Sequence, residues 1–403
     1  MIERRLHIVS FDVPFPADYG GVIDIFYKLK ALYQNDVEII LHIYHYGRGQ
    51  SKIELSKYCK EIYYYTRKVY KNPFMGTKPY IVSSRNSELL LENLKKDNAP
   101  ILFEGLHCTY HLDHPSLAKR FKIVRTHNIE HQYYKHLEKS ELRYFKKYFF
   151  RIEAEKLKKH QRILANANLI AAISPNDKTY FNKKFNNAMY LPAFHSNDTV
   201  NYPGSYGNFI LYHGNLSVPE NYNAAIELVK NVFSNIQTPV IIAGNNPPKE
   251  LIQLCKPYHH INLKTNISSA EIHELIKDAH INVLQTAQNT GIKLKLINAL
   301  YLGKYAIVNP LMVDGSGLEE LCIVTNRFEE MINQIELTML KAFDEEHFQH
   351  RKDILLRYFS NQSEIIRFID SIKFPEKFIE YGKKSRANKT FMRLYSFATQ
   401  LLA

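Results

Sequence analysis

The most informative stretch of this chain is QNTGIKLKLINALYLG, residues 288–303. It follows a strand-like run at 281–284, turns at Gly291, carries Lys293 and Lys295, and continues as an apolar helix. Free backbone N–H groups and the helix dipole favour an anion at such a junction, and a lysine adds a mobile positive charge. The segment therefore predicts a diphosphate site. The alternative is an ordinary strand-to-helix turn with lysines on its surface.

The same alternation of short apolar runs and helical segments extends through the rest of the chain. Before a polar, turn-rich stretch, strands are expected at 6–11, 37–43, 61–65, 101–103, 122–125 and 169–173. After it, strands are expected at 209–213, 239–243, 261–263, 281–284 and 306–308. Continuous apolar strands separated by helices are typical of parallel sheets covered on both faces. The sequence thus predicts an α/β protein with two doubly wound Rossmann-like domains.

A length of 403 residues suits this two-domain organisation. We expect one Rossmann-like domain at 1–194, a linker at 195–208 and a second domain at 209–380. A C-terminal helix at 381–403 is expected to return to the N-terminal domain. Because open parallel sheets bind ligands at the carboxyl ends of their strands, the site is expected in a central cleft between the domains.

The net charge of +13 is partly concentrated in two stretches. Residues 135–162 carry ten Lys or Arg against four acids, with aromatic residues interleaved, and a second basic stretch covers 383–393. Such patches suit anionic partners: a bilayer surface, a lipid-linked pyrophosphate or nucleic acid. For 135–162 the alternative is a solvated helix face. No recognised nucleic-acid motif accompanies these stretches, so no nucleic-acid partner is expected.

Cysteine spacing and hydropathy indicate the compartment. The four cysteines (Cys59, Cys108, Cys255 and Cys322) do not pair at metal or redox spacing, so a reducing compartment is expected. The first apolar run ends at Asp12, which suits a strand better than a secretory signal. No run approaches the roughly 18 apolar residues that cross a bilayer. We therefore expect a cytoplasmic protein, with any membrane contact peripheral, on the inner face of the plasma membrane.

Further motifs follow the predicted strands in order: FPADYGGV at 15–22, RTHN at 125–128, AIS at 172–174 and HGNLSVPEN at 213–221. Together with residues 288–303, they resemble the motifs of family 4 retaining glycosyltransferases, which have the GT-B fold. The donor-binding motif of that family reads G-x-(R/K)-x-K. The resemblance covers residues 5–325 approximately.

The resemblance implies transfer of a sugar from a nucleotide-sugar donor to a glycan or lipid-linked acceptor, with retention, in bacterial surface polysaccharide biosynthesis. It makes 1–194 the acceptor-binding domain and 209–380 the nucleotide-sugar-binding domain of a hexosyltransferase. It assigns His127, Lys293 and Lys295 to catalysis. Donor and phosphate contacts are expected at Gly20, Gly21, Gly214, Asn215, Asn221, Thr290, Gly291 and Asn298. Glu104 and His107 follow another predicted strand and are expected on the acceptor side of the cleft.

No metal or other cofactor is expected, because a cationic pocket can stabilise the departing diphosphate. The segment HNIEH at 127–131 also spells an inverted zinc-peptidase pattern. That chemistry needs both histidines on one helical face, whereas His127 directly follows a predicted strand. A zinc site is therefore not expected there.

The sequence departs from the family pattern at four positions. Asn298 and Thr290 stand where the family has two glutamates, and Asn215 and Asn221 stand where a common variant has Arg and Lys. Asparagine can still hydrogen-bond a hydroxyl, but without charge assistance. These departures leave open a second possibility, a non-catalytic nucleotide- or glycan-binding protein with the GT-B fold.

Overall fold

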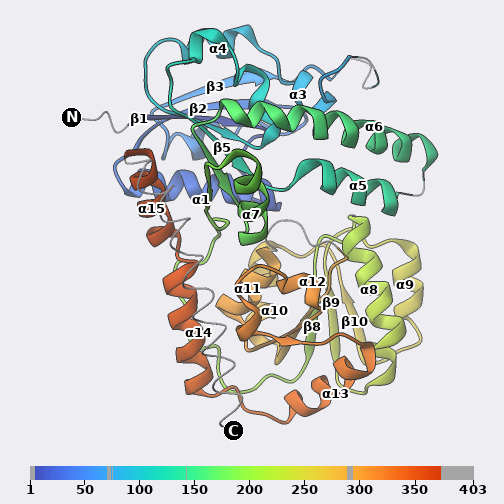
Figure 1. The fold of residues 1–403 in the computed structure, drawn as a ribbon. Coiled ribbons are helices and arrows are strands. Elements are labelled where there is room, and N and C mark those ends of the chain that lie inside the picture. Colours follow the sequence, from blue (N-terminus) through green and yellow to red (C-terminus); the bar gives the residue numbers. More distant parts are fainter. Residues whose placement is uncertain (1–4, 70–73, 75, 142, 288–293, 374–403) are drawn as a thin grey trace.

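A computed structural model describes residues 5–69, 74, 76–141, 143–287 and 294–373 of the chain. It contains two sheets of parallel strands, each covered by helices (Figure 1). The predicted fold class, α/β with two Rossmann-like domains, is therefore confirmed.

The N-terminal sheet has seven parallel strands in the order β3-β2-β1-β4-β5-β6-β7. Their bounds are β1 Arg5–Ser10, β2 Glu38–His45, β3 Glu61–Thr66, β4 Ile101–Glu104, β5 Lys122–Thr126, β6 Leu169–Ala172 and β7 Ala188–Tyr190. The order reverses between β1 and β4, which is the switch point where such sheets bind ligands. The helices are α1 Gly20–Gln34, α2 Lys52–Leu55, α3 Tyr80–Ser83, α4 Glu88–Leu94, α5 Glu130–Ser140, α6 Tyr144–His160 and α7 Pro175–Phe185.

Both faces of the N-terminal sheet are buried, which explains why its strands are apolar throughout. Successive residues point to opposite faces of a strand. Accordingly, Ile123 packs in the cluster that contains the apolar residues of α1, whereas Val124 packs with α4, α6 and α7. Each strand therefore needs apolar side chains at consecutive positions rather than at alternate ones.

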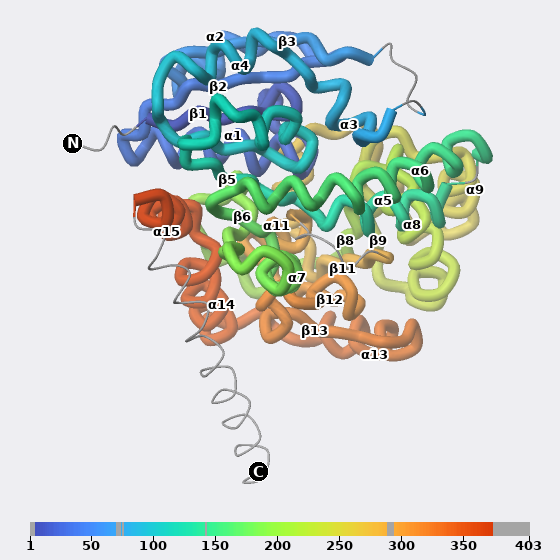
Figure 2. Tube along the Cα trace, turned by 45° about the horizontal axis from the view of Figure 1, so that its top comes forward, coloured from blue at the N-terminus to red at the C-terminus, as the bar shows by residue number. Residues whose placement is uncertain are grey.

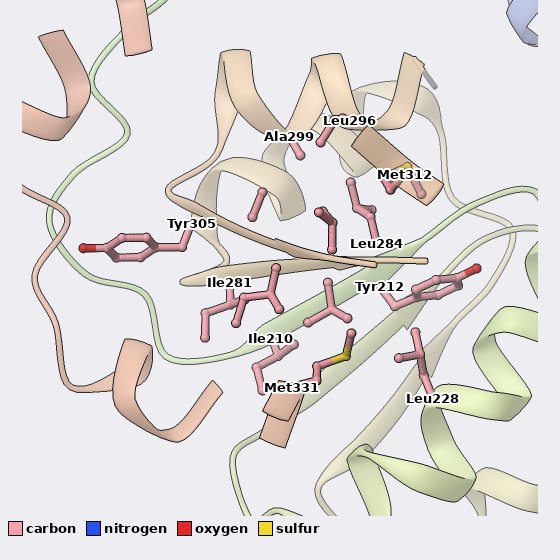
Figure 3. Packing of buried hydrophobic residues seen from close by; sticks show 14 of the residues in the cluster. Ile210, Tyr212, Leu228, Ile281, Leu284, Leu296, Ala299, Tyr305, Met312 and Met331 are labelled. Carbon is pink, nitrogen blue, oxygen red and sulfur yellow. The ribbon is translucent and has the colours of Figure 1, made fainter. Parts of the chain in front are cut away.

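The C-terminal sheet has six parallel strands in the order β10-β9-β8-β11-β12-β13. Their bounds are β8 Ile210–His213, β9 Val240–Ala243, β10 Ile261–Lys264, β11 Ile281–Leu284, β12 Tyr305–Val308 and β13 Ile323–Val324. The helices are α8 Pro219–Asn231, α9 Lys249–Cys255, α10 Ser269–Asp278, α11 Leu294–Leu302, α12 Pro310–Val313 and α13 Phe328–Met339. Figure 3 shows the core, where Leu284 of β11 lies near Leu296 of α11, while Ile281 of β11 lies near Ile210 of β8.

The chain returns to the N-terminal domain through its last two described helices, α14 Glu345–Tyr358 and α15 Asn361–Lys373 (Figures 1 and 2). Ile365 and Phe368 of α15 are completely buried in the same cluster as Leu29 and Leu32 of α1. The return thus lies before α15, whereas the sequence places the end of the C-terminal domain at 380. The helix expected at 381–403 lies outside the described residues.

Two crossing segments join the domains, and they are hydrogen-bonded to each other. The Asn361 side chain donates to the backbone oxygen of His195 (2.7 Å) and accepts from its backbone N–H (3.1 Å). The His195 ring hydrogen-bonds the Phe359 carbonyl through Nε2 (2.9 Å) and the Asn197 N–H through Nδ1 (3.2 Å). These partners fix a neutral imidazole, with its proton on Nε2, at the hinge.

Stability of the fold is expected to fall in weak acid because of His195. Burial lowers the pKa of His195 to about 4, whereas a histidine in the unfolded chain titrates near 6.5. The unfolded chain therefore binds more protons below pH 6.5, and the stability that neutral His195 contributes is lost as the pH falls. Between pH 7 and pH 5 this loss is on the order of 2 kcal/mol.

Urea unfolding of wild type and His195→Gln at both pH values measures this contribution. The free energy of unfolding of the wild type should exceed that of His195→Gln by about 2 kcal/mol less at pH 5 than at pH 7. The exposed His259 supplies a matched control, since His259→Gln should keep the pH dependence of the wild type. Equal pH dependence in wild type and His195→Gln would contradict the assignment.

Candidate functional site

A cavity of 320 Å³ lies between the two domains, beside the hinge. Six residues that the sequence assigns to donor contacts or catalysis line it: Gly20, Gly214, Asn215, Asn221, Lys295 and Asn298. They come from the start of α1, the turn after β8, the first turn of α8 and the first turns of α11. The structure therefore brings both domains to one pocket. Thr290, Gly291 and Lys293 lie outside the described residues.

The N-terminal domain contributes the amino end of α1, where Gly20 and Gly21 begin the helix. A Cβ atom on Gly20 would lie 3.8 Å from Cδ1 of Leu294, the first residue of α11 in the other domain. A Cβ atom on Gly21 would lie 2.6 Å from Cζ of Phe11, which is too close without movement of the ring. Tyr19 at the N-cap makes no side-chain capping bond. The helix thus offers its first backbone amides to the pocket.

The C-terminal domain contributes a tight turn after β8. The Asn221 side-chain amide donates to the Asn215 carbonyl at 3.0 Å, and a Cβ on Gly214 would lie 3.0 Å from Asn221 Cγ. The side-chain oxygen of Asn215 accepts hydrogen bonds from the backbone N–H and hydroxyl of Ser217. The two asparagines therefore shape the turn, and the positive charge in this part of the pocket comes from a lysine.

Lys295 supplies that charge from the first turn of α11. Its Nζ donates to the Gln285 carbonyl at 3.2 Å, lies 3.5 Å from Asn221 Oδ1 and sits 5.7 Å from the Tyr212 ring centroid. One helical turn later, Asn298 Oδ1 accepts a hydrogen bond from the side-chain amide of Asn197 at 2.9 Å. Asn298 therefore links α11 to the hinge segment that contains Asn197.

His127 follows β5 directly and belongs to a buried network of charges. Its Nε2 lies 3.0 Å from Glu104 Oε2, and its Nδ1 lies 3.9 Å from Asp24 Oδ2. Lys28 bridges the two acids, at 2.7 Å from Glu104 and 3.0 Å from Asp24. Arg125, completely buried, donates to both carboxylate oxygens of Asp24 at 3.0 Å. The network holds the His127 ring, which also meets the Phe11 ring edge-on at 5.5 Å.

The cations of this network keep both acids ionised. Burial alone would raise the pKa of Asp24, but the Arg125 guanidinium and the Lys28 ammonium hold it below its ordinary value. Burial also opposes ionisation of Glu104, and the Lys28 ammonium together with the His127 hydrogen bond lowers its pKa below the usual range.

The same acids and His127 could in principle hold a metal ion, because they offer ligand atoms within 4.8 Å of one another. Lys28 and Arg125 already occupy the carboxylate oxygens, however, and a divalent cation would have to compete with both. The donor set thus suits an ion-pair network better than a metal site.

Glu104 and His107, the two residues expected on the acceptor side, differ in their burial and in their contacts. Glu104 is completely buried, and its carboxylate pairs with Lys28 and His127, so it lies behind the cleft surface. His107 packs against Phe11, with ring centroids 5.4 Å apart. Burial, together with the nearby Arg85 cation, lowers the pKa of His107 well below its ordinary value.

Sequence reasoning overlooked Glu130 as a functional candidate. It is buried at the start of α5, with its Oε1 3.9 Å from His107 Nδ1. Burial and the charge of Asp177 raise the pKa of Glu130 to about 8, and such a carboxyl group can donate a proton near neutral pH. In the sequence, Glu130 stands out only as part of the zinc-peptidase-like pattern of the HNIEH segment. His131, the last residue of that segment, instead hydrogen-bonds Gln161 at 3.1 Å.

A second groove, of 730 Å³, lies between α5 and α8. His136, Lys139 and Ser140 of α5 line one wall, and Glu227 of α8 lies on the other. Gln285 also lines this groove, and its carbonyl accepts the Lys295 hydrogen bond, so the groove adjoins the first pocket. No motif in the sequence indicates this groove, because its residues share no spacing.

Comparisons with known proteins bear on the fold. No protein-family model matches the chain. An uncharacterized 44.6 kDa protein in the cps region of Klebsiella pneumoniae is 28% identical over 352 residues, which cover 81% of this chain and 87% of that protein.

Similar solved structures include Anabaena HepE in complex with UDP and glucose, with a TM-score of 0.63 and 12% identity, covering 91% of this chain and 99% of HepE. A glycosyltransferase from Rickettsia africae has a TM-score of 0.59 and 15% identity, covering 92% of this chain and 98% of that protein. An α,α-trehalose-phosphate synthase (UDP-forming) from Burkholderia xenovorans has a TM-score of 0.57 and 11% identity, covering 92% of this chain and 100% of that protein. These structures are GT-B glycosyltransferases, and the chain shares their fold.

Proposed function

We propose that this protein is a glycosyltransferase that moves a sugar from a nucleotide-sugar donor to a glycan or lipid-linked acceptor. The observation that carries the proposal is the pocket at the hinge. There the amino end of α1 and the β8 turn, from opposite domains, meet Lys295 in a single cavity. Backbone amides and an ammonium group form a site suited to a diphosphate.

In this proposal, the growing charge on the departing nucleoside diphosphate is stabilised by Lys295 and by the amides at Gly20 and Gly21. His127, held by Glu104, orients the donor sugar from the N-terminal domain. Asn298 hydrogen-bonds the ribose through its amide nitrogen while its oxygen remains bonded to Asn197. Closure at the hinge brings the two halves together and excludes water.

The finer assignments rest on the family resemblance and on one relative. We propose retention of configuration, a hexosyl donor and a reaction that needs no metal, as the resemblance implies. The relative in the Klebsiella cps region favours a role in surface polysaccharide biosynthesis. Such a role places the protein in the cytoplasm, on the inner face of the plasma membrane.

A non-catalytic nucleotide- or glycan-binding protein is the second candidate. It is favoured by Asn298, which replaces a charged residue of the family and whose oxygen is already bonded at the hinge. Release of UDP from UDP-glucose, or from a panel of UDP- and GDP-sugars, separates the two candidates. Binding of a nucleoside diphosphate without any turnover across the panel would support the non-catalytic protein.

Lys295→Met is expected to weaken nucleoside diphosphate binding by about tenfold or more, because a charge-assisted contact contributes roughly 1.5–3 kcal/mol. Isothermal titration calorimetry with UDP and GDP measures the effect, and the sequence predicts a similar loss for Lys293→Met. Lys277→Met, on the exposed side of α10, is the matched control. Equal affinity in Lys295→Met and the control would remove the proposed phosphate site.

A further inference from the structure

The hairpin formed by α5 and α6 carries an unusual exposed surface. The two helices lie side by side, and in Figures 1 and 2 they extend beyond the N-terminal sheet, near α8. At the start of α6, Tyr144 is 77% exposed and Phe145 is 83% exposed. Tyr148, one turn later, is 49% exposed and its ring lies 5.8 Å from the ring of Phe74. Contiguous exposed apolar side chains with polar residues around them mark a binding surface.

These aromatics belong to the face of α6 that points away from the protein. Glu153, Ala154 and Leu157 are buried and mark the inner side of the helix. Tyr148 and Arg151 lie on the opposite side at helical spacing. The exposed aromatic residues are therefore not needed to attach α6 to the domain, because the inner side does this.

The same surface is strongly basic. In the fully described range 143–162, the exposed basic residues are Arg143, Lys146, Lys147, Arg151, Lys158, Lys159 and Arg162. Glu155 is the only exposed acid in that range, and it pairs with Lys135 at 3.4 Å. Glu141, at the end of α5, pairs with Arg143 and Lys146. An excess of positive charge remains around the aromatic residues.

We infer that the outer face of α6, centred on Tyr144, Phe145, Tyr148 and Arg151, docks on an anionic lipid bilayer. Aromatic rings enter the headgroup region, while lysine and arginine side chains reach anionic phosphates. A single-stranded nucleic acid could use the same charges and stack its bases on these rings, but no recognised nucleic-acid motif accompanies them. None of the helices in the described residues has the length and apolar composition needed to cross a bilayer.

The second groove adjoins the hairpin that carries the docking face. His136, Lys139 and Ser140 of α5 line the groove, while α6 in the same hairpin carries the docking face. An acceptor anchored in the bilayer by a lipid could enter the groove beside the nucleotide pocket. This step rests on the proposed function and assigns a lipid-linked acceptor, whereas docking itself does not depend on catalysis.

Vesicle flotation of the full chain tests the inference. The probe is phosphatidylcholine vesicles with or without about 30% phosphatidylglycerol, at low and high salt. Wild type should bind the anionic vesicles at low salt and lose binding at high salt. Lys147→Glu/Arg151→Glu should weaken binding by about tenfold or more, and Tyr144→Ser/Phe145→Ser should weaken it by about fivefold.

Matched controls lie on other surfaces. Lys249→Glu/Lys256→Glu in the C-terminal domain reverses two exposed charges, and Leu340→Ser removes a side chain that is 82% exposed. Both should bind vesicles as the wild type does. Calorimetry should show that both α6 variants bind UDP with the affinity of the wild type. This measurement separates a failure of docking from a failure of the proposed function.

The inference would be overturned if the wild type did not bind anionic vesicles. It would also be overturned if both α6 variants bound these vesicles as strongly as the wild type. A single-stranded RNA oligonucleotide forms a further arm of the experiment. RNA binding that depends on Lys147 and Arg151, without vesicle binding, would identify this face as a nucleic-acid site instead.

Discussion

Arg125→Met is expected to lower the free energy of unfolding by about 3–5 kcal/mol, the usual cost of removing one partner from a buried ion pair. The Arg125 side chain is completely buried and donates to both oxygens of Asp24 and to the carbonyls of Leu191 and Pro192. Methionine fills similar space but leaves these acceptors without the guanidinium. Urea unfolding followed by circular dichroism measures the loss.

A double-mutant cycle isolates the ionic part of this effect. Asp24→Asn removes the charge that Arg125 neutralises, while Lys28 and Glu104 still pair at 2.7 Å. The double variant Asp24→Asn/Arg125→Met should therefore be more stable than the sum of the single effects predicts, by about 1–3 kcal/mol. Should Arg125→Met fail to fold, Arg125→Lys keeps the charge without the two-pronged contact and should lose less stability.

The control is an ion pair between an arginine and a glutamate on the surface. Arg143, whose side chain is 73% exposed, pairs with Glu141, and Arg143→Met should change stability by no more than about 0.5 kcal/mol. A cost for Arg125→Met as small as that of Arg143→Met would show that the buried network contributes little. It would also remove the basis for regarding His127 as rigidly held.

The strands and the glycine turns could be predicted from the sequence because their causes are local. Val124 and Ile123 face different helical layers, so an apolar run was the direct consequence of a doubly covered sheet. Gly20 begins α1 after the loop that follows β1, and Gly214 directly follows β8. The topology of such sheets places ligands at both positions. The convergence of these turns with Lys295 follows from the fold alone.

Other features depend on contacts between distant segments, which no local pattern reveals. Asp24, Glu104 and Arg125 come from α1, β4 and β5, so their pairing required the three-dimensional structure. For the same reason, Glu104 could be placed after the correct strand but not recognised as buried. The early return of the chain depends on Ile365 and Phe368 packing against α1, although their spacing alone also suits a helix of the C-terminal domain.

His127→Asn should reduce release of UDP from UDP-glucose, or from the best donor of the panel, by about 100-fold or more. The carboxylate of Glu104 holds the ring 3.0 Å away, at the carboxyl end of β5 and beside Phe11. In the proposed function this ring orients the donor sugar, whereas the diphosphate contacts lie at Lys295 and the α1 amides. The affinity for UDP should therefore change much less than the turnover.

His131→Asn is the matched control, because His131 is a buried histidine of the same segment that hydrogen-bonds Gln161 instead of Glu104. Initial rates and calorimetric UDP affinities, with an unfolding curve for each variant, distinguish a functional from a structural role. A structural role alone would lower stability and leave the turnover of folded His127→Asn close to that of His131→Asn. That result would reduce His127 to a member of the ion-pair network and leave the chemistry to the C-terminal domain.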